Sequence, residues 1–262
     1  MSEHILLTID GPRATITLNN PAVHNRLAPA DIKAFIGHLD TIDAATDLRV
    51  LVVTGAGEKT FCAGFDLGSL RPGVAASPDD GGGDGRRYSF EILCDRLEAS
   101  RVPTIGALNG SVYGGGTDLA LACDFRVGIR GMRAFLPAGR LGLHYYPSGL
   151  RRFTERLGPG VAKRFLLLAE EFDGNELHRI GYLDWLVERA ALAAKVDGLA
   201  ATASGLAPLS LAGMKASIND IACSVFDEDI IRQRIRTCAM SEDLVEGIAA
   251  VNDKRKPVFR GR

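Results

Sequence analysis

The sequence has no apolar run approaching the length of a membrane span, and it has almost no net charge. Its 31 lysines and arginines nearly balance 32 aspartates and glutamates, which leaves a formal charge of −1. A membrane-spanning helix needs about 20 predominantly apolar residues. Binding to nucleic acid or to an anionic surface calls for a clear excess of basic residues. We therefore expect neither a membrane nor a nucleic acid among the partners of this chain.

Cysteines are few and scattered along the chain. The five cysteines lie at positions 62, 94, 123, 223 and 238 and form no Cys-x-x-Cys pair. This odd, dispersed set argues against a disulfide framework and against a zinc site. No signal-peptide pattern precedes the first predicted strand, which begins at His4. We expect a reduced, cytoplasmic protein with no metal site.

Glycines, by contrast, are concentrated at the start of one predicted helix. Residues 103–126, PTIGALNGSVYGGGTDLALACDFR, predict a buried strand, a glycine-rich turn and an apolar helix that begins near Gly114. Glycine at a helix start costs backbone entropy, but it bares N–H groups and the positive end of the helix dipole toward a negatively charged ligand. Asp118 lies one turn into this helix. At the end of the segment, Asp124 and Arg126 are interpreted as a structural ion pair.

A second turn of the same kind occurs earlier in the chain. Residues 50–54, VLVVT, are typical of a strand buried on both faces. They lead to FCAGFDL at residues 61–67, where Ala63 and Gly64 allow close approach of the backbone and Asp66 can cap a short helix. Two turns that expose backbone amides can converge on one oxygen, which is the arrangement of an oxyanion hole.

The remaining pattern alternates strands with helices and favours an α/β domain. Residues 4–10 and 14–19 predict a hairpin, residues 28–45 an amphipathic helix, and residues 181–187 a short strand. Further helices are predicted at 88–100, from 150 onward with a break at 158–160, and at 190–204, 208–223, 226–240 and 241–251. Residues 70–87, rich in Gly, Pro and Asp, predict either a surface loop or a substrate lid.

These motifs together resemble the crotonase (enoyl-CoA hydratase/isomerase) superfamily. Besides residues 61–67 and 110–126, the resemblance includes ITLNNPAVHNRL at 16–27 and EGIAAVNDKRKPVFRGR at 246–262. It implies a spiral of ββα turns over residues 1–190, which binds acyl-CoA. It also implies a C-terminal helical region, residues 191–262, that covers coenzyme A and assembles the chain into a homotrimer or hexamer.

The resemblance implies site residues as well. The backbone amides of Phe65 and Gly115 match the two donors that stabilise a thioester enolate in the family. No permanently bound cofactor is implied, because the coenzyme A thioester is the substrate. The positions that match the coenzyme A contacts are Val23, His24, Arg26, Ala63, Phe65, Asp66, Leu67 and Lys254.

The acid–base positions depart from the family pattern. Family hydratases carry two glutamates, and the matching positions here are Asp118 and Ala138. The loop that follows offers His144, Tyr145 and Tyr146, and we expect His144 or Tyr145 to assist Asp118 in moving protons. Decarboxylases of methylmalonyl-CoA in this superfamily have a tyrosine at the position that corresponds to Tyr145.

We therefore expect an enzyme of the lyase or isomerase type that hydrates or isomerises an enoyl-CoA. Two alternatives stay open at this point. One is a decarboxylase of malonyl- or methylmalonyl-type CoA on the same fold. The other is an acyl-CoA-binding protein without catalytic activity.

Overall fold

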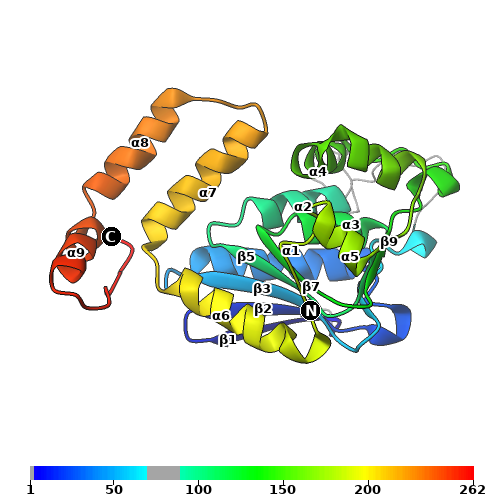
Figure 1. The fold of residues 1–262 in the computed structure, drawn as a ribbon, viewed down its shortest axis with the longest axis horizontal. Helices are drawn as coiled ribbons and strands as arrows, with labels where there is room; N and C mark the ends of the chain where they lie inside the picture. The colour runs from blue at the N-terminus through cyan, green and yellow to red at the C-terminus, as the bar shows by residue number, and fades with distance from the viewer. Residues whose placement is uncertain (1–2, 70–88) are drawn as a thin grey trace.

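A mostly parallel sheet runs through the computed structural model, which describes residues 3–69 and 89–262 (Figure 1). Within these residues the strand order is β1 (Ile5–Asp10), β2 (Arg13–Leu18), β3 (Val50–Gly55), β5 (Thr104–Leu108), β7 (Phe125–Ile129) and β10 (Trp185–Val187). Strands β1 and β2 form an antiparallel hairpin, and the other neighbours pair in parallel. The predicted hairpin and the α/β class are both confirmed.

Helices cover both faces of this sheet. Successive side chains of a strand point to opposite faces, so β3 places Val50 and Val52 against α6 (Leu192–Ser204) and Leu51 and Val53 in the main core. The main core is closed by α1 (Pro29–Ala44), α2 (Ser89–Glu98) and α3 (Gly115–Leu121) (Figure 1). Burial on both faces explains why the sequence of β3 is continuously apolar.

A second, smaller sheet was not predicted from the sequence. Its order in the described chain is β4 (Thr60–Cys62), β6 (Ser111–Tyr113), β8 (Arg133–Phe135) and β9 (Phe172–Asp173). Strands β4 and β6 are parallel neighbours, and Cys62 pairs with Val112. Each of these strands leads into one of the two glycine turns, so the small sheet brings those turns side by side.

The segments after β8 form two further helices that pack near the small sheet. These are α4 (Pro147–Leu167) and α5 (Gly174–Arg179). Helix α4 begins three residues before the predicted start. It is interrupted at Gly158, which has φ +76°, within the predicted break at residues 158–160. The predicted loop at 70–87 lies outside the described residues.

The last three helices form an arm beside the sheet. They are α7 (Pro208–Ala222), α8 (Glu228–Ala239) and α9 (Glu242–Asn252), and they extend beyond α6 to one side of the molecule (Figure 1). Helix α7 is joined to the core because Lys215 Nζ lies 2.7 Å from Asp124 Oδ2 and Asn219 donates to the Glu98 carbonyl oxygen. None of the helices in the described chain combines the length and the hydropathy that a membrane crossing requires.

The predicted ion pair between Asp124 and Arg126 is wrong. The Arg126 guanidinium instead lies 2.9 Å from Asp184 and donates to the carbonyl oxygens of Tyr182 and Cys123. Asp124 accepts hydrogen bonds from Thr104 and pairs with Lys215. Tertiary packing has supplied each group with a partner that is distant in the sequence.

Arg126 is therefore expected to matter strongly for stability. Only 5% of Arg126 is exposed, so Arg126→Met leaves the Tyr182 carbonyl oxygen without its side-chain donor and Asp184 without its ion-pair partner. The free energy of unfolding should fall by about 3 kcal/mol. Arg130→Met is the matched control, because its ion pair with Glu188 is largely exposed and should cost at most about 1 kcal/mol. Urea denaturation measures both values. Equal effects would contradict the assignment.

Candidate active site

The two glycine turns are in direct contact. Gly64 has φ +84°, and a Cβ atom at this position would lie 2.3 Å from the amide nitrogen of Gly115. A Cβ atom on Gly116 would lie 2.3 Å from the Cys62 carbonyl oxygen. Neither distance is compatible with any side chain, so glycine is required at both positions. This contact fixes the residue after Gly64 against the first turn of α3.

Two backbone amides at this contact have no acceptor. Leu27 donates to the Gly64 carbonyl oxygen, and Asp66 donates to the Leu27 carbonyl oxygen. In this parallel bridge the N–H of Phe65 therefore points away from Leu27. Gly115 opens α3, where the first N–H groups have no acceptor within the helix. In the part of the chain that the structure describes, no group accepts a hydrogen bond from the amide of Phe65 or of Gly115.

The loop before Leu27 is held by a buried asparagine that the sequence analysis did not single out. Asn25 is 1% exposed, and its amide nitrogen donates to the carbonyl oxygens of Ala56, Thr60 and Phe61. His24 and Asn25 both have positive φ, at +59° and +54°. Two consecutive residues in this region need strong support from their surroundings, and the side-chain bonds of Asn25 provide it.

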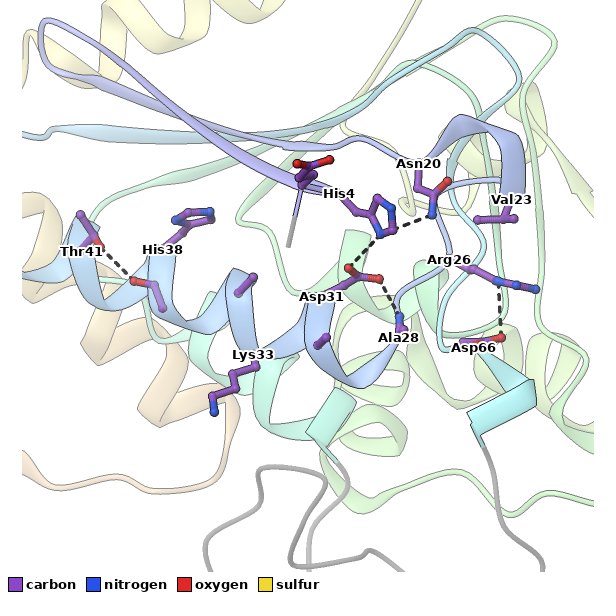
Figure 2. Close-up of a pocket in the computed structure, with 14 residues that line it drawn as sticks. His4, Asn20, Val23, Arg26, Ala28, Asp31, Lys33, His38, Thr41 and Asp66 are labelled. Carbon is purple, nitrogen blue, oxygen red and sulfur yellow. Dashed lines mark hydrogen bonds and ion pairs between the residues drawn. The ribbon is translucent and has the colours of Figure 1, made fainter. Parts of the chain in front are cut away.

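This loop places several predicted coenzyme A contacts at one end of a cavity. Val23, Arg26 and Asp66 line part of a cavity of about 1000 Å³, which continues along α1 toward His4 (Figure 2). The Arg26 guanidinium lies 3.4 Å from Asp66 and is half exposed. Asp31 faces the same cavity and caps α1 through the amide of Ala28. An exposed cation beside an open cavity suits a phosphate-bearing ligand.

The remaining predicted contacts divide into two groups. Ala63 donates its amide to the His24 carbonyl oxygen, and Leu67 begins an exposed single turn after Asp66, so both adjoin the loop. Lys254, in contrast, follows α9 at the end of the arm. Figure 1 places α9 far from α3. One chain therefore does not bring Lys254 to the other predicted residues.

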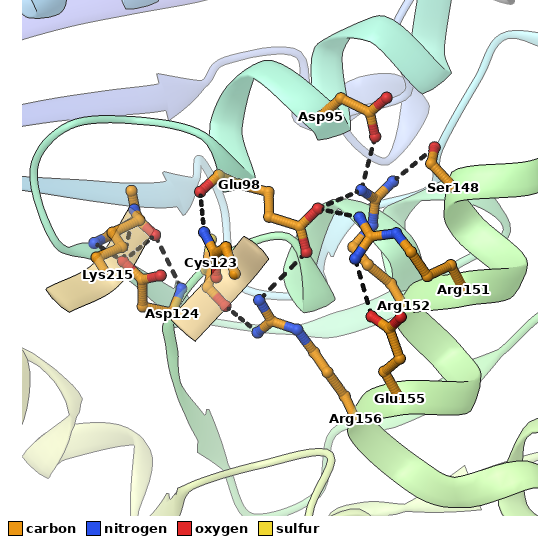
Figure 3. Close-up of polar contacts among 12 residues, drawn as sticks. Asp95, Glu98, Cys123, Asp124, Ser148, Arg151, Arg152, Glu155, Arg156 and Lys215 are labelled. Carbon is orange, nitrogen blue, oxygen red and sulfur yellow. Dashed lines mark hydrogen bonds and ion pairs between the residues drawn. The ribbon is translucent and has the colours of Figure 1, made fainter. Parts of the chain in front are cut away.

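Asp118 is completely buried and is bound by an arginine that the sequence analysis missed. Arg152 donates from Nε to Oδ1 at 2.9 Å and from Nη2 to Oδ2 at 2.8 Å, and both residues are 0% exposed. Arg152 also contacts Asp95 and Glu98 (Figure 3). Burial opposes its charge, but Asp118 and its hydrogen bonds outweigh burial and raise the pKa of Arg152. The sequence gives no local signal for this pair, because 34 positions separate its members.

Tyr146 completes the set of donors to Asp118. Its hydroxyl donates to Oδ2 at 2.6 Å, and its ring stacks on that of Tyr145 with centroids 4.5 Å apart. Burial and the Asp118 charge raise the pKa of both phenols well above the usual value, so both stay protonated. His144 is exposed and contacts only the Tyr145 carbonyl oxygen among the described residues. Ala138 is buried in a short 3-10 turn.

The fold and the site define a class: an α/β fold in which two glycine turns in contact carry backbone amides without acceptors, next to a helix with a buried carboxylate. A family model described as enoyl-CoA hydratase/isomerase matches residues 11–262. The chain therefore belongs to the enoyl-CoA hydratase/isomerase family. The predicted family and the prediction of an acyl-CoA enzyme are confirmed.

Individual relatives agree with this assignment. A carnitinyl-CoA dehydratase from Salmonella enteritidis is 31% identical, and the match covers 100% of both chains. The structure resembles an enoyl-CoA hydratase from Bacillus anthracis with a TM-score of 0.90, at 25% identity over 99% of this chain and 100% of the other. It also resembles an enoyl-CoA hydratase/carnithine racemase from Magnetospirillum magneticum, with a TM-score of 0.88 and 25% identity over 100% and 97% of the two chains. The predicted crotonase-like fold is confirmed.

The support that Asn25 gives to its loop can be tested directly. Asn25→Ala removes its side-chain hydrogen bonds and leaves buried carbonyl oxygens without donors, so the free energy of unfolding should fall by about 3 kcal/mol. His24→Ala is the matched control, because His24 has nearly the same φ but a single side-chain hydrogen bond, to Thr60. It should cost about 1 kcal/mol. Similar losses, measured by chemical denaturation, would show that backbone strain alone governs the loop.

Proposed function

We propose that this chain binds an acyl-CoA thioester and stabilises its enolate with the amides of Phe65 and Gly115. The observation that carries the proposal is the contact between Gly64 and Gly115, which holds two amides without acceptors at one place. Hydrogen-bond donors fixed in advance around a developing negative charge are commonly the largest contribution to catalysis of this kind. Because both donors belong to the backbone, the Phe65 side chain shapes the pocket and leaves the charge stabilisation unchanged.

The proposed reaction is the addition or loss of water across an enoyl-CoA, or the movement of its double bond. Each of these passes through negative charge on the thioester oxygen, which the two amides would stabilise. The names of the relatives, a dehydratase and a hydratase, support this lead. Asp118 is the only carboxylate at a family acid–base position, because Ala138 occupies the other.

A second candidate is decarboxylation of a malonyl- or methylmalonyl-type CoA. Ala138 supplies no carboxylate, and both oxygens of Asp118 are bound by Arg152. Decarboxylation forms the same enolate without a base, since carbon dioxide leaves with the bond that breaks. The Tyr145 phenol, protonated and next to Tyr146, would orient the departing carboxylate.

Coenzyme A itself is proposed to lie along the loop at residues 23–26 and the turn at residues 63–67. The exposed guanidinium of Arg26 would meet its phosphates, and Lys254 would reach it from a neighbouring subunit. All five cysteines are free thiols, which fits the cytoplasmic location that the sequence predicts.

The test of this proposal replaces Gly64. In Gly64→Ala the new Cβ would collide with the Gly115 amide, so one donor is displaced and turnover should fall about 10²–10³-fold. Gly131→Ala is the control, because Gly131 has φ +82° but nothing lies within 4 Å of an added Cβ atom. This variant therefore has the same backbone strain as Gly64→Ala without the collision. Phe65→Ala keeps the amide and should change turnover by less than about tenfold.

Turnover is measured with crotonyl-CoA and with methylmalonyl-CoA, which separates the two candidate reactions. Hydration of the first supports the lead, and release of carbon dioxide from the second supports the alternative. Wild-type protein that binds a thioester with its oxygen directed away from residues 65 and 115 would overturn the proposal. So would a Gly64→Ala variant as active as Gly131→Ala.

Assembly into trimers is proposed from the apolar surface of the arm. Val245 and Ile248 on α9 are 70% and 57% exposed, and side chains of this kind are normally covered by a partner. We expect the wild type to sediment as a trimer or hexamer. A double variant, Val245→Asp with Ile248→Asp, should sediment as a monomer. Ile9→Asp, at an exposed apolar position of β1, is the control and should keep the assembly. Unchanged sedimentation of the double variant would exclude this surface.

A further inference from the structure

We infer that Tyr146 exchanges the proton with the substrate and that Asp118 takes part only through the Tyr146 hydroxyl. The inference rests on the proposed function, since it assumes an enolate held at Phe65 and Gly115. It assigns a role to a phenol that the family pattern of two carboxylates does not contain. It also makes Asp118 and Arg152 positioning residues, which act on Tyr146 without touching the substrate.

Asp118 has no access to a ligand. Its carboxylate is 0% exposed, Oδ1 accepts from Arg152, and Oδ2 accepts from Arg152 and Tyr146. Arg152 is equally buried and keeps its proton, because its pKa is raised by Asp118 against the effect of burial. Of the groups that hydrogen-bond to Asp118, Tyr146 and the fully buried Cys94 thiol carry a proton that can be exchanged. Tyr146 is also the only donor that is partly exposed.

The packing of α3 against α2 brings the Tyr146 hydroxyl to the same end of the site as the Gly115 amide. A Cβ atom on Gly115 would lie 2.8 Å from the ring of Phe90, so α3 and α2 touch at these two residues. One turn further along both helices are Asp118 and Cys94, and both contact the Tyr146 hydroxyl, at 2.6 and 3.9 Å. One turn of helix is about 5.4 Å. A thioester oxygen at the Gly115 amide would thus present its α- and β-carbons toward this hydroxyl.

The hydrogen bonds of the Tyr146 hydroxyl have a defined direction. The Tyr146 hydroxyl donates its proton to Asp118 at 2.6 Å, and its oxygen accepts a hydrogen bond from the Tyr145 hydroxyl at 3.4 Å, which leaves one lone pair of the phenol oxygen for a substrate. The titratable groups in contact with this oxygen are Cys94 of α2, Asp118 of α3 and Tyr145 of the same loop. Arg152 of α4 lies behind Asp118, on the same carboxylate oxygen as Tyr146. Burial and the nearby Asp118 charge raise the pKa of Cys94, so the thiol is neutral. Within the described chain, Asp118 is therefore the one base to which the phenol can pass a proton.

With a 3-hydroxyacyl-CoA as substrate, the proposed reaction is the loss of water. The bond between the α-carbon and its hydrogen breaks, its electron pair enters the enolate, and the proton goes to the Tyr146 oxygen. The phenol proton moves to Oδ2 of Asp118 in the same event. The enolate then expels the β-hydroxyl group, which takes a proton from Tyr146 and leaves as water. The proton held by Asp118 returns to Tyr146. The enoyl-CoA is released, the protein regains its starting protonation, and hydration is the reverse.

The experiment compares Tyr146→Phe, Asp118→Asn and the double variant. Turnover of crotonyl-CoA and exchange of solvent deuterium into the acyl group of butyryl-CoA report proton transfer, and calorimetry with butyryl-CoA reports binding. Each single variant should lose about 10²–10⁴-fold in rate, the usual contribution of a general acid or base. The double variant should be no slower than the slower single one, because one relay is broken either way. Binding of butyryl-CoA should be unchanged within about threefold.

The control is Tyr182→Phe. Tyr182 is a buried phenol that donates to the Thr117 carbonyl oxygen of the same helix, so this variant loses a comparable hydrogen bond outside the relay. It should melt at a lower temperature but keep its exchange rate. A second readout needs no turnover: Asp118→Asn removes a charge that raises the pKa of Tyr146, so ultraviolet titration should show a tyrosine ionising at lower pH. In the double variant only the part of that change that belongs to Tyr145 should remain, because the same charge raises the pKa of both phenols.

Each other outcome overturns the inference. Full activity in Tyr146→Phe with loss in Asp118→Asn would mean that Asp118 acts directly. Full activity in Asp118→Asn would mean that Tyr146 needs no carboxylate, and additive losses would mean that the two groups act separately. An unshifted tyrosine titration in Asp118→Asn would remove the coupling itself. If wild-type protein does not bind butyryl-CoA at all, the proposed function fails, and that result is distinct from any of these.

Discussion

The close packing of two glycine turns is the constraint on which the site depends. The backbone at Gly64 touches the first amide of α3 with no room for a single additional carbon atom. This approach needs strand β4 beside β6, since each strand delivers one turn, and it needs Phe90 of α2 to close over Gly115. The small sheet therefore has a function that its short strands would not suggest: it sets the separation of two amides.

A second constraint follows from charge. Arg152 is fully buried and contacts three carboxylates, Asp95, Glu98 and Asp118. A charge in such a position must be paired, because an isolated ion in the interior is very costly. The consequence for chemistry is that Asp118 is committed to a structural partner before any substrate arrives. A carboxylate bound in this way can accept a proton and return it, but another group must carry the proton between the carboxylate and a ligand.

The sequence predicted the parts of this molecule that local pattern determines. The continuous apolar residues of β3 predicted a strand buried on both faces, which the structure confirms. The glycine turns pointed to Phe65 and Gly115, whose role as oxyanion donors stays a prediction. The partner of Asp118 could not be predicted, because Arg152 lies in a helix 34 positions further along the chain. Nothing in the sequence around Arg152 distinguishes it from an arginine on the surface. The assumed pair of Asp124 with Arg126 failed for the same reason: proximity in sequence was taken for proximity in space. Strands such as β9, with two residues, are too short to show a period.

The length of one side chain connects these observations. The position that carries glutamate in family hydratases carries Asp118 here, and aspartate is shorter by one methylene. A shorter side chain keeps the carboxylate close to α3, where the fork of Arg152 binds both oxygens. The space toward the ligand is then occupied by the phenol of Tyr146, whose hydroxyl reaches back to the same carboxylate. In this arrangement the short acid and the tyrosine depend on each other, because the carboxylate holds the phenol in place and the phenol is the group proposed to contact the substrate.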